Sequence, residues 1–276
     1  MSTKRTHHVT TTDGVTIGAT VHGQGPPVVF IQGTAGDGDL DWTRTVEYLT
    51  DQYTCHLLSM RGRGLSGDHP DVTPHRLVND IVSYVDSIGQ PTRLVAWSGS
   101  SDRALAAAAQ SNAVEAVAPF EPVMPQLMDD QLQAGLGDAM AHAGGLAAEG
   151  KLAAGVRTFL SGFFGDEGTA VAEELGYFEA TGRYLTHMFK VLEQEMEHGP
   201  PCADPNVLSA ISAPVMVLIG SNTEPLFAAA AQHVVDHVPN ARMQEIPGAG
   251  HAGPLTHPEA LAKALTEFFS PAQQPA

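Results

Sequence analysis

The chain of 276 residues carries 31 acidic and 14 basic side chains, which give a formal net charge of −17 with histidine neutral. Because this excess of negative charge repels polyanions, nucleic-acid binding is excluded as a function. No run of about 18 apolar residues could span a bilayer, and polar residues rather than an apolar signal core follow Met1, so we expect a cytoplasmic protein with no membrane partner.

The first 120 residues alternate short apolar runs with turn residues and amphipathic stretches, a pattern typical of βα units that feed a largely parallel sheet. The apolar runs predict strands over residues 15–21, 27–31, 53–59, 93–97 and 116–120. Helical periodicity between these runs predicts helices over residues 41–50, 74–88 and 99–110. An α/β fold follows from this alternation.

The strand pattern is absent from residues 122–204, where helix-forming stretches rich in Ala, Met and Phe predict a helical lid. The pattern then resumes, with strands expected over 214–220 and 242–246 and helices over 228–237 and 258–269. The predicted organisation is an α/β core made of 1–121 and 205–270, a lid insertion over 122–204, and a flexible tail over 271–276.

Ser98 lies between the predicted strand 93–97 and an alanine-rich helix, which is the context of a nucleophile elbow. The tight strand-to-helix turn of an elbow requires small side chains two residues before and two residues after the nucleophile. Ala96 and Ser100 meet this requirement, although the usual motif has glycine at both positions. A serine N-cap of the following helix is the alternative reading.

Two glycine-rich loops could complete a site around Ser98. After the strand 27–31, the turn Gln32-Gly33-Thr34-Ala35-Gly36 could aim a backbone N–H of Gly33 or Thr34, together with that of Gly99, at an oxyanion. After the strand 242–246, the loop Gly248-Ala249-Gly250-His251 leaves the imidazole free of bulky neighbours. Histidine is the side chain whose pKa near neutrality suits proton transfer in both directions, so His251 is the candidate general base.

The order of these features resembles the α/β-hydrolase superfamily from about Thr12 to Phe269. The motifs that carry the resemblance are the Gln32-Gly33 turn, the Arg61-Gly62-x-Gly64-x-Ser66 turn, the Trp97-Ser98 elbow, the helical insertion and Gly250-His251. The sequence departs from many members at Gln32, where they have His, and at Ser59, where they have Asp. The resemblance implies an α/β-hydrolase fold and a triad with Ser98 as the nucleophile and His251 as the base.

Two glutamates are candidates for the third member of that triad. Glu224 follows the strand after the lid, where most of the superfamily has its acid, but it could equally cap the next helix. Glu121 follows the strand before the lid, the position that the zearalenone lactonases use. We favour Glu121, because the Trp-Ser-Gly-Ser-Ser elbow and the Glu-Pro step before the lid are similar to that subset.

The sequence thus predicts a serine hydrolase that acts through an acyl-enzyme on Ser98. Its expected substrate is a small-molecule carboxylic ester or lactone with a bulky hydrophobic portion. The many Met and aromatic residues of the lid favour such a substrate. No metal or organic cofactor is expected, and a homodimer is left open. The alternatives are a lyase, a cyclase or a C–C hydrolase on the same fold, or a ligand receptor on the same scaffold.

Overall fold

The computed structural model describes residues 5–270, and the predicted flexible tail over 271–276 lies outside the described residues. Within residues 5–270, eight strands form one sheet in the order β1-β2-β4-β3-β5-β6-β7-β8. The pairs β1–β2 and β2–β4 are antiparallel, and the other pairs are parallel. The strands are β1 (Arg5–Thr10), β2 (Thr16–Gly23), β3 (Pro27–Ile31), β4 (Thr54–Ser59), β5 (Thr92–Trp97), β6 (Val114–Phe120), β7 (Val215–Gly220) and β8 (Ala241–Ile246).

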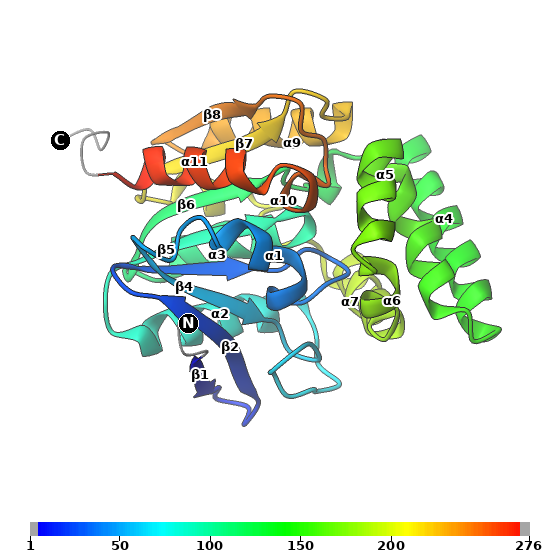
Figure 1. Cartoon of the computed structure of the whole chain (residues 1–276), viewed down its shortest axis with the longest axis horizontal. Helices are drawn as coiled ribbons and strands as arrows, with labels where there is room; N and C mark the ends of the chain where they lie inside the picture. Colours follow the sequence, from blue (N-terminus) through cyan, green and yellow to red (C-terminus); the bar gives the residue numbers. More distant parts are fainter. Residues whose placement is uncertain (1–4, 271–276) are drawn as a thin grey trace.

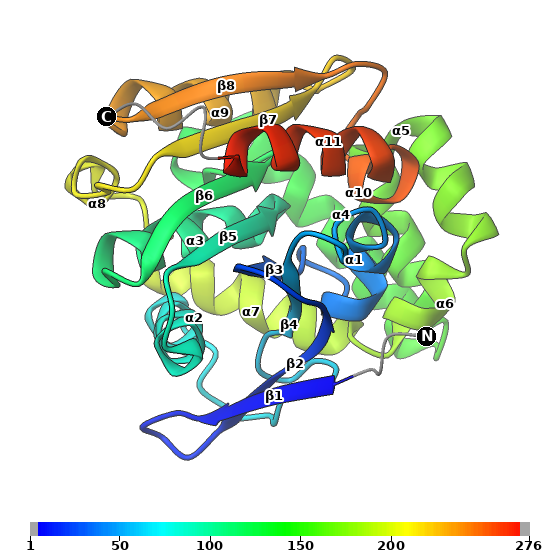
Figure 2. The ribbon, with the colours of Figure 1, turned by 60° about the vertical axis from the view of Figure 1, so that its left-hand side comes forward.

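Helices cover both faces of the sheet and one end of it. Figure 2 shows α2 and α3 on one face and α1 and α11 on the other, while α4 to α7 lie together beyond one end of the sheet (Figure 1). The helices are α1 (Gly38–Val46), α2 (Pro74–Ile88), α3 (Ser101–Gln110), α4 (Asp130–Ala148), α5 (Leu152–Glu174), α6 (Tyr177–Gly182), α7 (Leu185–His198), α8 (Pro205–Ser209), α9 (Pro225–His237), α10 (Gly253–Thr256) and α11 (Pro258–Phe269), with short 3₁₀ helices η1 (Ser98–Ser100) and η2 (Pro125–Leu127). Among the described residues, none of these helices combines the length and apolar character needed to cross a bilayer.

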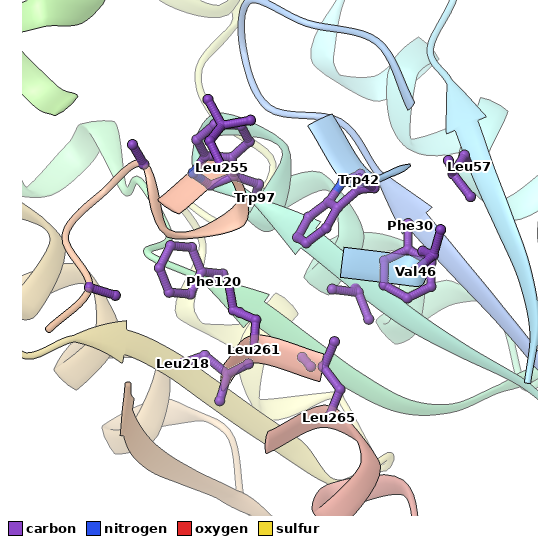
Figure 3. Close-up of a cluster of buried hydrophobic side chains, with 14 of the residues drawn as sticks. Phe30, Trp42, Val46, Leu57, Trp97, Phe120, Leu218, Leu255, Leu261 and Leu265 are labelled. Carbon is purple, nitrogen blue, oxygen red and sulfur yellow. The ribbon is translucent and has the colours of Figure 1, made fainter. Parts of the chain in front are cut away.

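The central strands are buried on both faces, so their side chains alternate between two separate hydrophobic clusters. In β3, Val28 and Phe30 join the cluster under α1 and α11, whereas Val29 and Ile31 join the cluster under α2, α3 and α9. This alternation follows from the two-residue repeat of a strand. Figure 3 shows the first cluster, where Phe30, Trp42 and Val46 meet side chains of β4 and β5.

The structure confirms the expected mostly parallel sheet flanked by helices. Each predicted strand begins and ends within two residues of the observed one. The helix predicted over residues 41–50 instead spans Gly38–Val46. It begins earlier because the Asp37 carboxylate caps it by accepting the Leu40 N–H at 3.0 Å. The strand β1 was missed. Its sequence is polar, and β1 is held by backbone pairing to β2 at the sheet edge rather than by a buried apolar face.

A buried ion pair fastens the turn after β4 to helix α2. Arg61 donates to both carboxylate oxygens of Asp80 at 2.6 Å, and the two side chains have exposed fractions of 0%. A further donation reaches Asp13 at 3.0 Å, so the guanidinium joins three segments of the chain. Two parallel bonds between a guanidinium and a carboxylate fix both the distance and the orientation of the groups.

We expect Arg61→Met to lower the free energy of unfolding by about 3–5 kcal/mol, because it leaves the Asp80 carboxyl buried without a partner. Arg76→Met is the matched control, since the Arg76 side chain is 30% exposed and its contacts with Asp71 at 3.3 Å and Asp13 at 3.6 Å are partly exposed pairs. This control should cost less than about 1 kcal/mol. Urea unfolding of the three proteins measures both values, and equal losses in the two variants would contradict the prediction.

Candidate active site

A sharp turn between β5 and α3 carries Ser98. Its backbone φ is 57°, in a region that costs a non-glycine residue of order 1–3 kcal/mol. Ala96 and Ser100 on either side are both buried, and their small side chains let the strand and the helix approach closely. The turn thereby presents the Ser98 hydroxyl at the carboxyl end of β5.

His251 lies on the loop between β8 and α10 and reaches Ser98 from the other end of the chain. Its Nε2 is 2.9 Å from the Ser98 Oγ, and its Nδ1 is 3.3 Å from Glu121 Oε2. The imidazole is buried, and burial lowers its pKa below the ordinary value because the charged form loses water. The hydrogen bond and negative charge of Glu121 oppose this shift without reversing it, so the net effect favours the neutral imidazole, which is the form that accepts a proton.

Glu121 is the first residue after β6, and its φ of 46° is also in the left-handed region. Within residues 5–270, Ser98 and Glu121 are the only non-glycine residues with positive φ. The Glu121 side chain has an exposed fraction of 0%, and its second oxygen accepts the Gly220 N–H at 2.8 Å. One carboxylate oxygen is therefore anchored to the sheet while the other faces the imidazole.

The register of the sheet explains why these residues meet. Trp97 and Phe120 are paired in the parallel ladder of β5 and β6, so Ser98 and Glu121 leave neighbouring strands at the same level. Glu224 occupies a different place. It is an exposed residue at the N-cap of α9, and its side chain makes no capping hydrogen bond. Of the two candidate acids, the described structure thus brings only Glu121 against His251.

Two aromatic side chains hold His251 in place. Phe227 stacks on the imidazole with ring centroids 3.8 Å apart and an interplanar angle of 7°. The Trp97 indole N–H donates to the His251 carbonyl at 2.9 Å. Sequence reasoning missed Phe227, because its position two residues into α9 gives no local sign of contact with a loop about 25 residues later.

The structure corrects one expected oxyanion donor. The Gly33 N–H donates to the buried Asp41 carboxylate at 2.7 Å, so it is not available to a substrate oxygen. The Thr34 N–H has no acceptor among residues 5–270. A Cβ added at Gly99 would lie 2.6 Å from the Thr34 hydroxyl, so Thr34 and Gly99 approach each other beside Ser98. These two residues remain the predicted donors.

A cavity opens at Ser98 and His251. Helices α4 to α7 and the segment before α4 supply much of its wall, and most of the side chains in that wall are apolar. The lining residues from this helical segment are Val123, Pro125, Met128, Leu136, Phe159, Leu160, Phe163, Phe164, Tyr177, Leu192 and Glu195. Other Met and aromatic residues of the segment, such as Met124 and Met188, are buried in the core instead.

A buried charged cluster lies behind the elbow. Arg103 on α3 donates to Glu195 on α7 at 2.6 Å, and Arg103 Nη1 lies 3.8 Å from Asp102. Neither carboxyl oxygen of Asp102 has a hydrogen-bond partner in the described chain. Burial raises the pKa of Asp102 to about 8 against the opposing charge of Arg103, so this carboxyl is largely protonated at neutral pH.

Comparisons with known proteins agree with this architecture. A family model described as the alpha/beta hydrolase family matches residues 21–264. An alpha/beta hydrolase from Sphaerobacter thermophilus is 26% identical over 96% of this chain and 100% of its own, with a TM-score of 0.73. A thermophilic esterase from Thermogutta terrifontis is 20% identical over 96% of this chain and 97% of its own, with a TM-score of 0.75.

A bromoperoxidase from Bacillus anthracis is 18% identical over 96% of this chain and 99% of its own, with a TM-score of 0.78. At this identity, as for the esterase, the likeness concerns the fold alone. A search of the curated proteins gave no match to this chain.

The protonated Asp102 carboxyl makes stability depend on pH in a defined direction. Its pKa of about 8 in the folded protein lies above the ordinary value of 3.8, so the stability it contributes is present below pH 4 and is lost as the pH rises through 8. Asp102→Asn cannot ionise. Between pH 5 and 8 we therefore expect the free energy of unfolding of the parent to fall more steeply than that of this variant, by on the order of 1 kcal/mol per pH unit.

Urea unfolding at pH 5, 6.5 and 8 measures this difference. Asp41, whose pKa burial raises to about 7, titrates in both proteins and cancels in the comparison. Parallel pH profiles for the parent and Asp102→Asn would show that Asp102 is ionised throughout and would contradict the prediction.

Proposed function

Because this chain belongs to the alpha/beta hydrolase family, we propose that it cleaves a carboxylic ester or lactone with a bulky hydrophobic portion through an acyl-enzyme on Ser98. The observation that carries the proposal is the continuous chain of contacts from Ser98 Oγ through the His251 imidazole to Glu121. This arrangement supplies a nucleophile, a base and a group that orients the base, as acyl transfer requires.

In the proposed reaction, His251 Nε2 takes the hydroxyl proton as Ser98 Oγ attacks the carbonyl carbon. The Thr34 and Gly99 N–H groups donate to the negatively charged oxygen that forms. When the intermediate collapses, His251 passes its proton to the leaving alcohol. A water molecule then gives a proton to His251 as its oxygen attacks the acyl carbon. His251 returns this proton to Ser98 Oγ as the bond between Oγ and the acyl carbon breaks, which releases the acid and restores the serine. All proton transfers use His251, so the proposal needs no metal or organic cofactor.

The composition of the cavity supports a bulky hydrophobic substrate. Phenylalanine and leucine are the commonest residues in its wall, and burial of apolar substrate surface against apolar side chains is favourable because it removes that surface from water. We propose that helices α4 to α7 act as the lid over this cavity. Their position beyond one end of the sheet supports this role (Figure 1).

We expect Ser98→Ala to lower ester turnover by at least about 1000-fold, because no other group can form the acyl-enzyme. A series of p-nitrophenyl esters with short and long acyl chains measures turnover, and a fluorophosphonate probe measures covalent reaction at the serine. The parent should react with the probe and should cleave esters with longer acyl chains faster. The Ser98→Ala variant should neither react with the probe nor cleave the esters at a comparable rate. A variant with near-parental turnover would contradict the assignment of the nucleophile.

A second test distinguishes Glu121 from Glu224 as the acid of the proposed triad. Glu121→Gln should lower kcat about 100-fold or more, because a neutral amide cannot stabilise the imidazolium that forms as Ser98 attacks. Glu224→Gln should keep kcat within about twofold of the parent, since the Glu224 side chain is exposed at the start of α9. Steady-state kinetics on one ester measures both, and the reverse ranking would overturn the assignment of the acid.

A further inference from the structure

Charged side chains form hydrogen bonds to the turn that follows β3 from both sides. Asp41 on α1 accepts the Gly33 N–H through Oδ2 at 2.7 Å, inside the protein. Arg63 donates to the carbonyls of Thr34, Ala35 and Gly36 at 3.0, 2.7 and 2.8 Å. The peptide groups of the turn are therefore held in one orientation. In that orientation the Gly33 N–H points to Asp41, while the Thr34 N–H stays without an acceptor among the described residues.

The carboxylate of Asp41 is also bound by the helical segment that covers the cavity. The Tyr177 hydroxyl, from the first residue of α6, donates to Asp41 Oδ1 at 2.8 Å, and both groups are buried. The ring of Tyr177 lines the cavity and contacts Phe164, with centroids 6.1 Å apart. One oxygen of the Asp41 carboxylate thus accepts a hydrogen bond from the turn after β3, and the other accepts one from α6. The two donor residues, Gly33 and Tyr177, are separated by more than 140 residues in the sequence.

Local packing leaves the Asp41 carboxylate little freedom. A Cβ added at Gly36 would lie 1.9 Å from Asp41 Oδ1, so only glycine at this position leaves room for the carboxylate. Asp41 itself has an exposed fraction of 1%. Because water cannot replace a lost partner at this depth, removal of the Tyr177 hydroxyl should loosen Asp41 and, through it, the Gly33 peptide.

We propose that Asp41 and Tyr177 are positioning residues that hold the turn after β3 so that the Thr34 N–H faces the oxyanion, which makes α6 part of the machinery for transition-state stabilisation. This inference rests on the proposed function. An oxyanion donor acts through its fixed direction, so an error of a few tenths of an ångström weakens stabilisation of the transition state more than binding of the ground state.

The test compares two tyrosine-to-phenylalanine variants at the same junction. Tyr177→Phe removes the hydroxyl on Asp41 and keeps the ring in the cavity wall. Tyr184→Phe is the matched control, because its hydroxyl bonds Asp37 and the Gly64 N–H and does not touch residues 33–36. We expect Tyr177→Phe to lower kcat and the rate of fluorophosphonate labelling about tenfold with KM within twofold, and Tyr184→Phe to change neither by more than twofold.

Substitution of Asp41 gives a second, independent readout. Asp41→Asn keeps an oxygen for the Gly33 N–H and should retain kcat within about threefold, whereas Asp41→Ala should lose about 100-fold or more. Parental kcat in Tyr177→Phe, a loss confined to KM, or an equal loss in Tyr184→Phe would each overturn the inference. A parent that neither cleaves esters nor reacts with the fluorophosphonate would overturn the proposed function and this inference together.

Discussion

The parallel register between β5 and β6 is the constraint on which the rest of the site depends. Because Trp97 pairs with Phe120, the next residue of each strand leaves the sheet at the same edge and level. Both of these residues, Ser98 and Glu121, adopt a left-handed backbone that costs free energy. The strain is sustained by the buried strands before each residue, and it turns both side chains toward the space where His251 enters.

Burial sets the chemistry of that space. Phe227 covers one face of the imidazole, and the ring centroids of Phe164 and Trp97 lie 6.3 and 6.0 Å from that of His251, so few water molecules can stabilise the charged form of His251. The Glu121 carboxylate, itself fixed by Gly220, counteracts this loss of hydration. The same apolar surroundings strengthen a hydrogen bond to any charge that develops beside Ser98.

Polar contacts, in addition to apolar packing, join the helical segment α4–α7 to the sheet. Each contact links a carboxylate to a hydroxyl or a guanidinium across the boundary between the helical segment and the sheet. The pairs are Asp41–Tyr177, Asp37–Tyr184 and Arg103–Glu195. Since buried polar groups lose free energy when a partner is absent, these contacts favour one position of the helices over the cavity.

The sequence by itself determined the strands from 15 to 246, the helical stretch after β6, the position of Ser98 between a strand and a helix, and that of His251 in a loop after β8. It could do so because apolar periodicity and loop composition are local properties. Only the tertiary structure decided that Glu121 rather than Glu224 lies against the imidazole, and that Asp41 occupies the Gly33 N–H. It also decided that the polar segment at the start of the chain forms β1. These outcomes depend on strand order, register and partners far apart in the sequence, which no local pattern encodes.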